Sequence, residues 1–369
     1  MAEKYSYRPY QPGDESAINE LYFKVTGRRR TAAQFAWQWL NAPQGQGDMW
    51  LIEATDDSGN VKLIGHHGVM PVAFSDGDTD LIFGKTENTM VLPEYRRKIL
   101  YPRFEKKFIK IYSDRYDALF STMGPAAAIR QRKAMGYEFP AEWRTDRCCA
   151  SLYSEFLFIA STVKNKLFPG FSSNANYSVP FGKKEKSYRV LLRNGFLSSK
   201  EASNAGFFDE FWNQAKANFS VSPSRRKENL VWRFWENPYK DHLTLIIDER
   251  ELRGYCVISL TPRHNLEVSL DDFCVQSNST GEAEIIFNRL LRILERSGIY
   301  SLAVTSTTDS VLSSYGVTQA KAMVAQKILK KYRPEKPRLM PRKITPKGLK
   351  KSIENRGWDI SGIVLEGRL

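Results

Sequence analysis

The feature of this sequence that most constrains its fold is an internal repeat. FAWQWLNAP at residues 35–43 and LVWRFWENP at residues 230–238 place aromatic residues and a final proline in the same order. Each copy is followed by an apolar strand pattern, a polar turn and a second strand pattern that contains a glycine, at 49–69 and 242–260. Self-similarity at this distance is typical of a duplicated unit. We therefore expect two similar domains.

The residues upstream of each copy support a duplication. DESAINELYFKV at 14–25 has apolar residues at helical spacing, with Asp14 as the expected N-cap, and FFDEFWNQAKANF at 207–219 is its counterpart. The tryptophans of the two repeats stand at near-helical spacing, which indicates core positions rather than platforms for a sugar. These residues are Trp37, Trp39, Trp232 and Trp235.

The patterns predict a mixed α/β (α+β) fold in which each domain is a central, mostly antiparallel sheet flanked by helices. In the first half we expect strands near 5–10, 49–55, 61–73, 81–91, 118–123 and 137–152, and helices near 14–26, 31–41, 102–114 and 126–135. In the second half we expect strands near 243–248, 252–260, 266–275 and 300–306, and helices at 282–296 and from about 309. The predicted boundaries are a first domain at 1–153, a connector at 154–186, a second domain at 187–332 and a basic segment at 333–369.

Composition indicates a soluble, cytoplasmic protein. The N-terminal residues lack the apolar stretch of a secretory signal, and no apolar run is long enough to span a bilayer. FLFIASTV at 156–163 is too short to do so, and we expect it to be buried or interfacial. The four cysteines show no zinc-like spacing, so free thiols in a reducing compartment are expected, with no metal site.

Positive charge is concentrated near the C-terminus. Residues 327–351 contain 11 Lys or Arg and one Glu, a net +10 of the chain's +14. Such a segment suits an anionic membrane surface or tRNA, and it is equally consistent with a solvated linker. No DNA-binding motif accompanies it, so no DNA partner is expected.

One basic turn carries the main functional signal. TMVLPEYRRKILY at 89–101 has the pattern of a strand end, a proline turn, three cations and a helix start. With the element order and MGYEF at 135–139, it resembles the junction between strand four and helix three of the GNAT acyltransferase superfamily. The paired halves resemble tandem acetyltransferases of that superfamily, with the second half degenerate.

The resemblance implies that this loop binds the pyrophosphate of acetyl-CoA or another acyl-CoA, through backbone N–H groups and a helix N-terminus. Two positions that are glycine in the family pattern are Arg97 and Ile99 here, so the basic side chains would take over part of the contact. The candidate cofactor-binding residues are Met90, Val91, Arg96, Arg97, Lys98, Ile99 and Leu100.

Acyl transfer to an amine requires a base, donors for the thioester oxygen and an acid for the leaving thiolate. The resemblance directs attention to strand four, where Glu87 is the candidate base and Asn88 a residue that orients the substrate. Strand alternation places these two on opposite faces. His67, on the neighbouring strand, is a third candidate. The position of the family's acidic tyrosine is Arg132 here, which suits a thiolate or a phosphate but not proton donation.

The expected function is an acyltransferase that moves an acetyl or longer acyl group from acyl-CoA to an amine, on a small molecule, an activated sugar or a cell-envelope precursor. Two alternatives remain open at this point. Fem-type aminoacyl-tRNA-dependent transferases also join two such folds and lack the glycine loop. A degenerate, non-catalytic binding protein would also tolerate the lost glycines.

Overall fold

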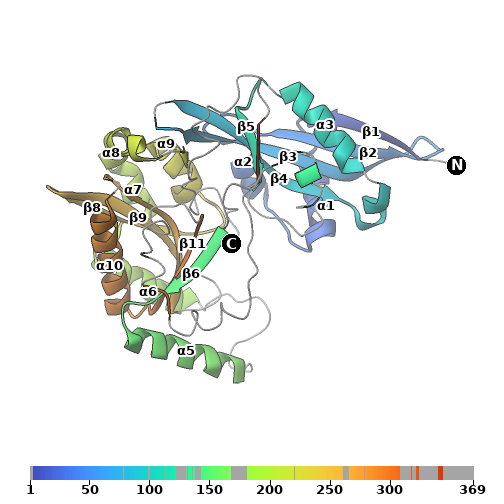
Figure 1. Ribbon diagram of the computed structural model, residues 1–369. Coiled ribbons are helices and arrows are strands. Elements are labelled where there is room, and N and C mark those ends of the chain that lie inside the picture. Colours follow the sequence, from blue (N-terminus) through green and yellow to red (C-terminus); the bar gives the residue numbers. More distant parts are fainter. Residues whose placement is uncertain are drawn as a thin grey trace. The chain divides into compact units, whose positions relative to one another are not determined.

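The computed structural model describes most of the chain (Figure 1). It covers residues 3–77, 79–98, 100–112, 114–121, 143–167, 181–219, 221–260, 266–277, 279–307 and 340–343, with isolated positions between 130 and 137 and between 317 and 323. Two compact units divide this chain, one mainly from Met1–Phe74 and Thr79–Pro140 and the other mainly from Ala141–Arg338. The domain boundaries drawn from the sequence remain predictions.

The first unit is built on a mixed sheet with the strand order β1-β2-β3-β4-β5-β12. Strands β1 and β2, β2 and β3, and β5 and β12 pair antiparallel, whereas β4 and β5 are parallel. Helix α3 joins the parallel pair, because two parallel strands cannot be connected by a tight turn. The bounds are β1 (Lys4–Pro9), β2 (Asp48–Thr55), β3 (Val61–Ser75), β4 (Asp80–Val91), α3 (Leu100–Tyr112), β5 (Ala118–Ser121) and β12 (Met340–Lys343).

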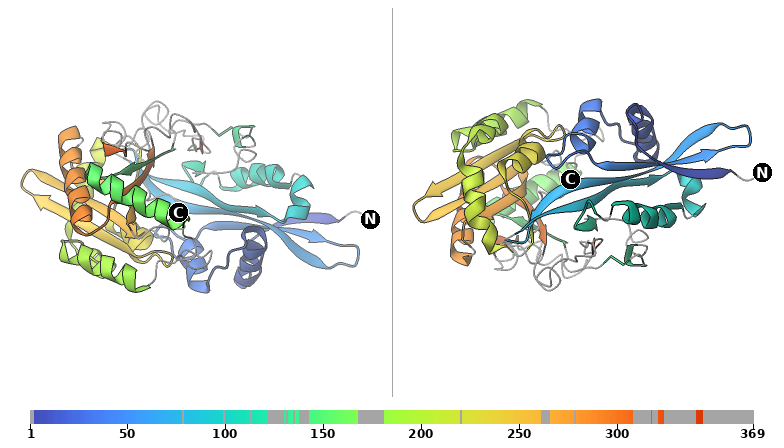
Figure 2. Two further views of the ribbon diagram at one scale, coloured as in Figure 1. Left: turned by 90° about the horizontal axis from the view of Figure 1, so that it is seen from below. Right: turned by 90° about the horizontal axis from the view of Figure 1, so that it is seen from above.

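Helices cover both faces of the first sheet. Helices α1 (Glu15–Thr26) and α2 (Ala32–Trp39) lie on one face and α3 lies on the other (Figure 2). A capping box begins α2: the Thr31 hydroxyl accepts from the N–H of Gln34, and the Gln34 side chain accepts from the N–H of Thr31. Trp37 and Trp39, near the end of α2, are 6% and 0% exposed, so the predicted core role of this pair is confirmed.

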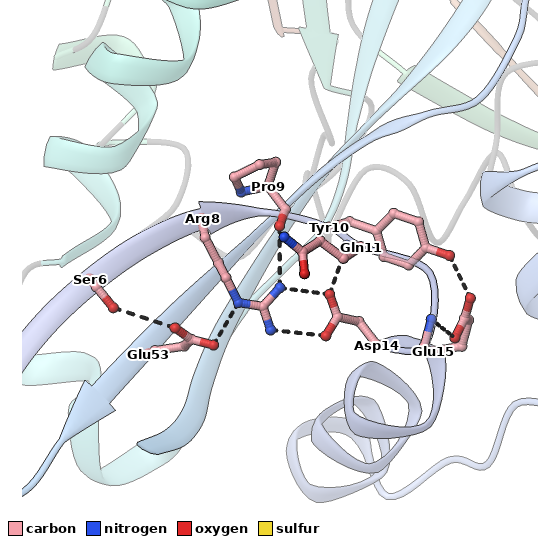
Figure 3. Close-up of polar contacts among 9 residues, drawn as sticks. Ser6, Arg8, Pro9, Tyr10, Gln11, Asp14, Glu15 and Glu53 are labelled. Carbon is pink, nitrogen blue, oxygen red and sulfur yellow. Dashed lines mark hydrogen bonds and ion pairs between the residues drawn. The ribbon is translucent and has the colours of Figure 1, made fainter. Parts of the chain in front are cut away.

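An arginine on the edge strand holds the start of α1 in place (Figure 3). Arg8 donates from its two terminal nitrogens to the Asp14 carboxylate at 2.7 and 2.9 Å, and from Nε to Glu53 at 2.8 Å. The hydrogen bonds from Arg8 lower the pKa of Asp14. Asp14 does occupy the N-cap position, but its side chain makes no capping bond to the first turn of the helix. The N-cap position expected from the sequence is confirmed, but the Asp14 carboxylate bonds Arg8 instead of the first turn of the helix.

The second unit repeats this plan. Its sheet has the order β6-β11-β10-β9-β8, with one parallel pair, β10 and β11, joined by helix α10. The other neighbours pair antiparallel. The strands of this sheet are β6 (Trp143–Cys148), β8 (His242–Glu249), β9 (Leu252–Leu260), β10 (Glu267–Val275) and β11 (Ser301–Thr307). A short strand, β7 (Ser222–Pro223), is not part of this sheet. The helices are α5 (Leu152–Leu167), α6 (Phe181–Arg193), α7 (Ser199–Asn204), α8 (Phe207–Ala215), α9 (Lys227–Leu230) and α10 (Thr280–Arg296), with a short η3 (Lys216–Asn218).

Alternation along β9 shows how this second sheet is covered. Cys256 faces a core formed with α10 and α6, whereas the Tyr255 ring packs on the opposite face against Phe208 and Phe211 of α8. The second Trp-rich segment is not the regular helix that was expected. It forms a π-helical turn, η4 (Val231–Trp235), in which all four of the aromatic and cationic side chains are buried. Trp232 and Trp235 are thus core residues, as predicted.

The shared order of two helices, three strands, a helix and a strand confirms the mixed α/β fold expected for both halves. Two strands, however, belong to the other sheet. The strand expected to end the first half, β6, pairs with β11, and β12, from the C-terminal basic region, pairs with β5. Met340–Lys343 therefore forms a sheet edge, while most of residues 327–351 lie outside the described part of the chain. None of the helices described is long and apolar enough to cross a membrane.

Candidate active site

Strand β4 is continuous from Asp80 to Val91, but its regular geometry has a break at Asn88. Asn88 has a φ of 49°, and among the described residues it is the only one other than glycine with a positive φ. Asparagine tolerates this left-handed conformation better than most residues do. The break lies beyond the point where the described pairing of β4 with β5 ends, at Lys85 and Phe120. A residue held in a rare conformation at such a place is a reason to look for function.

The break changes which side chains share a face. In a regular strand, residues three apart point to opposite sides. Here Thr86 and Thr89 both point to the α3 side, where Thr86 bonds Arg132 and Thr89 bonds His67. Met90 instead joins the core beneath α1. The regular alternation expected along β4 is therefore interrupted between Thr86 and Thr89.

A buried polar chain runs from Thr89 into the unit. The Thr89 hydroxyl lies 3.0 Å from Nδ1 of His67, and Nε2 of His67 lies 3.6 Å from a carboxylate oxygen of Glu105 on α3. The side chains of His67 and Glu105 are fully buried, whereas Thr89 is exposed. Burial lowers the pKa of His67 to about 4, although the Glu105 carboxylate acts in the opposite direction. The imidazole is therefore neutral near pH 7, with one nitrogen able to accept a proton.

Arg132 and Tyr137 complete this chain. The Tyr137 hydroxyl donates to Glu105 at 2.5 Å, and Arg132 donates to the Thr86 hydroxyl at 2.8 Å. The Arg132 guanidinium also lies over the Tyr137 ring, 5.1 Å from its centroid. Arg132 is thus a buried cation beside β4 and not a surface residue. This position fits the expectation that it could stabilise an anion.

The other face of β4 holds the candidate base Glu87. This side chain is 4% exposed, and its carboxylate lies 3.4 Å from the Lys85 ammonium group. Nδ1 of His66 is 2.9 Å from the backbone oxygen of Asn88, and burial lowers the pKa of His66 to about 3. The Nδ2 atom of Asn88 is buried and has no hydrogen-bond partner among the described residues. That amide nitrogen is therefore an unsatisfied buried donor.

The predicted phosphate loop is a compact turn. Pro93–Lys98 forms a 3-10 turn, η1, and α3 begins at Leu100, two residues earlier than expected. Arg96, Arg97 and Lys98 are exposed, although Arg96 Nε also donates to the Val91 oxygen at 3.3 Å.

No residue of this turn has a positive φ among those described, so an arginine at a glycine position of the family pattern carries no backbone penalty. Ile99 lies outside the described residues. Met90 and Leu100 are buried, so they could contact a ligand only through their backbone.

The second unit has a comparable irregularity without a basic turn. The register of β10 against β9 shifts between Leu270 and Asp272, which marks a bulge at Asp271. Burial raises the pKa of Asp271, but Lys240 and His242 lower it by more, so this pKa lies below its usual range. Asp272 is fully buried and accepts from Arg225 at 3.1–3.3 Å and from the Tyr255 hydroxyl at 2.6 Å. These contacts indicate a structural role for Asp272.

Sequence reasoning missed Glu105, Thr86 and Thr89. Glu105 falls between Phe104 and Phe108, two fully buried residues of α3, and an acid placed beside an apolar stripe was the available signal. The two threonines gave no signal, because their shared face depends on the break at Asn88. Of the predicted residues, the structure places His67 beside Thr89 of β4 and Glu87 beside Lys85 on the other face, and the basic turn follows the same strand.

Comparisons with known proteins concern the fold. No protein-family model and no curated protein matches the sequence. Among solved structures, a GCN5-related N-acetyltransferase from Anabaena variabilis ATCC 29413 is similar, with 13% identity, a TM-score of 0.57, and 92% of this chain and 73% of that chain covered. A probable N-acyltransferase from Enterococcus faecalis V583 has 11% identity, a TM-score of 0.57, and 93% and 73% coverage.

A third similar structure is the N-myristoyltransferase of Saccharomyces cerevisiae with bound myristoyl-CoA and inhibitors. It has 10% identity and a TM-score of 0.50, with 93% of this chain and 81% of that chain covered. Likeness at such low identity concerns the arrangement of elements and not the chemistry of individual residues. The chain therefore has the mixed α/β fold that these N-acyltransferases share.

Proposed function

We propose that the protein is an N-acyltransferase that takes its acyl group from acyl-CoA in the first unit. The observation that carries this proposal is the left-handed break at Asn88, followed on the same strand by a basic turn and a helix N-terminus. The break puts Asn88 in a left-handed conformation, and its side-chain amide nitrogen is a buried donor without a partner in the described part of the chain. The turn supplies positive charge for phosphates. Both features lie on a fold shared with N-acyltransferases.

The donor would lie along the end of β4. Arg97 and Lys98 are exposed at the end of the turn and would contact the pyrophosphate, where the dipole of α3 adds a favourable field. Arg96 would support the turn through its bond to Val91. The backbone of Met90 and Val91 would run beside the pantetheine arm, and the Asn88 amide would donate to the thioester oxygen.

The proton of the acceptor amine would leave through the buried chain. The exposed Thr89 hydroxyl would take the proton as it passes its own to Nδ1 of His67, and Glu105 would stabilise the imidazolium that forms. Arg132 would stabilise the CoA thiolate through its positive charge. Glu87 remains the second candidate for the base, and its ion pair with Lys85 means that it would first have to lose that partner.

The acceptor is proposed to be an amine, on a small molecule, an activated sugar or a cell-envelope precursor, and the reaction to be cytoplasmic. The acyl chain is acetyl or longer. Two neighbours support this range, because one is named as an N-acetyltransferase and another contains myristoyl-CoA. The proposed membrane or tRNA contact of residues 327–351 concerns a segment that lies mainly outside the described residues.

Ligand-dependent thermal unfolding tests the proposal. At a hundred times its dissociation constant, a ligand that binds only the folded chain adds about 2.7 kcal/mol of stability. We expect acetyl-CoA or a longer acyl-CoA to raise the melting temperature. Arg97→Ala/Lys98→Ala should reduce this shift, whereas Lys106→Ala/Lys110→Ala, an exposed pair on α3 with the same loss of charge, should not.

Two results would contradict acyl-CoA binding in the first unit. One is the absence of a shift with every CoA species at millimolar concentration. The other is an equal loss of the shift in both double variants. Stabilisation by tRNA without any effect of CoA would instead support an aminoacyl-tRNA-dependent transferase.

A further inference from the structure

Helix α5 turns an apolar face to the solvent. Leu152, Tyr153 and Phe156 are 75%, 65% and 67% exposed, and Val163 and Ile159 are 47% and 36% exposed. At 3.6 residues per turn, these positions fall within one stripe along the helix. Surface apolar residues usually occur singly, and a contiguous stripe marks a surface that contacts something else. Figure 1 shows α5 at the edge of the second unit.

The polar residues of α5 face the opposite way. Ser151, just before the helix, and Ser154 both donate to Glu295 of α10 at 2.5 Å, and these bonds lower the pKa of Glu295. Ser154 and Glu155, the one acidic residue of α5, are buried. A helix on the surface of a soluble protein normally has the reverse arrangement. The exposed stripe therefore carries no negative charge.

Positive charge accompanies the stripe in the sequence. The last turn of α5 contains Lys164 and Lys166. Helix α6 (Phe181–Arg193) adds three lysines and two arginines against one glutamate, so the two helices together have seven basic residues and two acidic ones, Glu155 and Glu185. An apolar stripe followed in the sequence by basic residues is a composition typical of a segment that lies in the headgroup region of a membrane.

We propose that the exposed face of α5 binds the surface of an anionic membrane, with Leu152, Tyr153 and Phe156 entering the acyl boundary. Lys186, Arg189 and Arg193, which are exposed on α6, contact lipid headgroups. Either a membrane or a second copy of this chain could cover the exposed face of α5, and charge complementarity favours the membrane. A second copy of this chain would bring the same basic residues against themselves, whereas an anionic bilayer neutralises them. The surface lies in the second unit, so the proposal does not depend on acyl-CoA binding in the first.

Vesicle co-sedimentation of the full chain tests this inference. We expect binding to vesicles of phosphatidylcholine with 30% phosphatidylglycerol, and weaker binding to pure phosphatidylcholine or in high salt. Leu152→Ser/Phe156→Ser should weaken partitioning by at least about tenfold, because two apolar side chains no longer leave water. The matched control is Val61→Ser/Ile285→Ser, since these two residues are 61% and 55% exposed elsewhere on the chain. The control should bind as the wild type does.

Three outcomes overturn the inference. In the first, the wild type does not sediment with anionic vesicles. In the second, the α5 variant binds these vesicles as well as the control variant does. In the third, the wild type is a dimer in solution and the α5 variant a monomer, which would make a second copy the occupant. Circular dichroism of both double variants checks that each is folded, as expected for substitutions at exposed positions.

Discussion

Replacing Asn88 with glycine or with alanine should separate the two roles of this residue. Both changes remove a buried amide nitrogen that has no partner among the described residues, so they recover the same desolvation cost. Both variants must adopt a φ of 49° at this position, but only alanine has a Cβ that disfavours this conformation. That conformation destabilises a residue with a Cβ by about 1–2 kcal/mol. The glycine variant is itself destabilised by about 0.5–1 kcal/mol, because glycine loses more conformational entropy on folding, and this reduces the difference between the two variants. We expect Asn88→Ala to be about 1 kcal/mol less stable than Asn88→Gly.

Urea unfolding of the two variants measures this difference, provided that their m-values agree. The glycine variant should also bind acyl-CoA more weakly, by about fivefold, because one hydrogen bond of roughly 1 kcal/mol is lost. An alanine variant as stable as the glycine variant would show that β4 is not broken at this position. Unchanged acyl-CoA affinity in Asn88→Gly would exclude the side-chain amide from donor binding.

Three further predictions concern the framework. Asp272→Ala leaves the buried Arg225 without its counter-charge and should cost about 3–5 kcal/mol in urea unfolding, whereas Asp248→Ala breaks a half-exposed ion pair and should cost less than about 1 kcal/mol. The pKa of His67 is about 4 when folded and about 6.5 when unfolded, so the unfolded chain binds more protons between these values. Stability attributable to His67 is therefore complete above pH 6.5 and falls by about 2 kcal/mol on acidification to pH 5, a loss that His67→Gln should reduce in parallel unfolding curves. Deleting the chain after Arg338 removes β12, and hydrogen exchange of the β5 amides should accelerate, since unprotected edge strands open more readily.

Much of the fold followed from local patterns. Most expected strands and helices lie within about two residues of their observed ends, because apolar periodicity reports which face of an element is buried. The pairing of β6 with β11 and of β12 with β5 could not be predicted from local patterns. Met340–Lys343 contains a proline and two cations, which are typical of an edge strand but do not show with which strand it pairs. A strand's partner is decided by tertiary contacts.

The candidate site was predictable only in outline. The basic turn was found because charge and proline are visible in a sequence. The buried chain from Thr89 to Glu105 was missed because it depends on a break in alternation at Asn88. A regular strand would have placed Thr86 and Thr89 on opposite faces. The outward apolar face of α5 was also missed in detail, since periodicity shows that a helix is amphipathic and not which face is covered.

Hydrogen–deuterium exchange with and without acyl-CoA tests the central claim most directly. If the first unit binds the donor, amides from Glu87 to Lys98 and in the first turn of α3 should become protected, while those of β10 around Asp271 should not change. An acyl-pantetheine, which lacks the nucleotide and the pyrophosphate, should protect the turn less, because the proposed contact of the turn is with phosphates. Protection centred on β10 and α10 would place the donor in the second unit. No protection of β4 at saturating acyl-CoA would contradict the account.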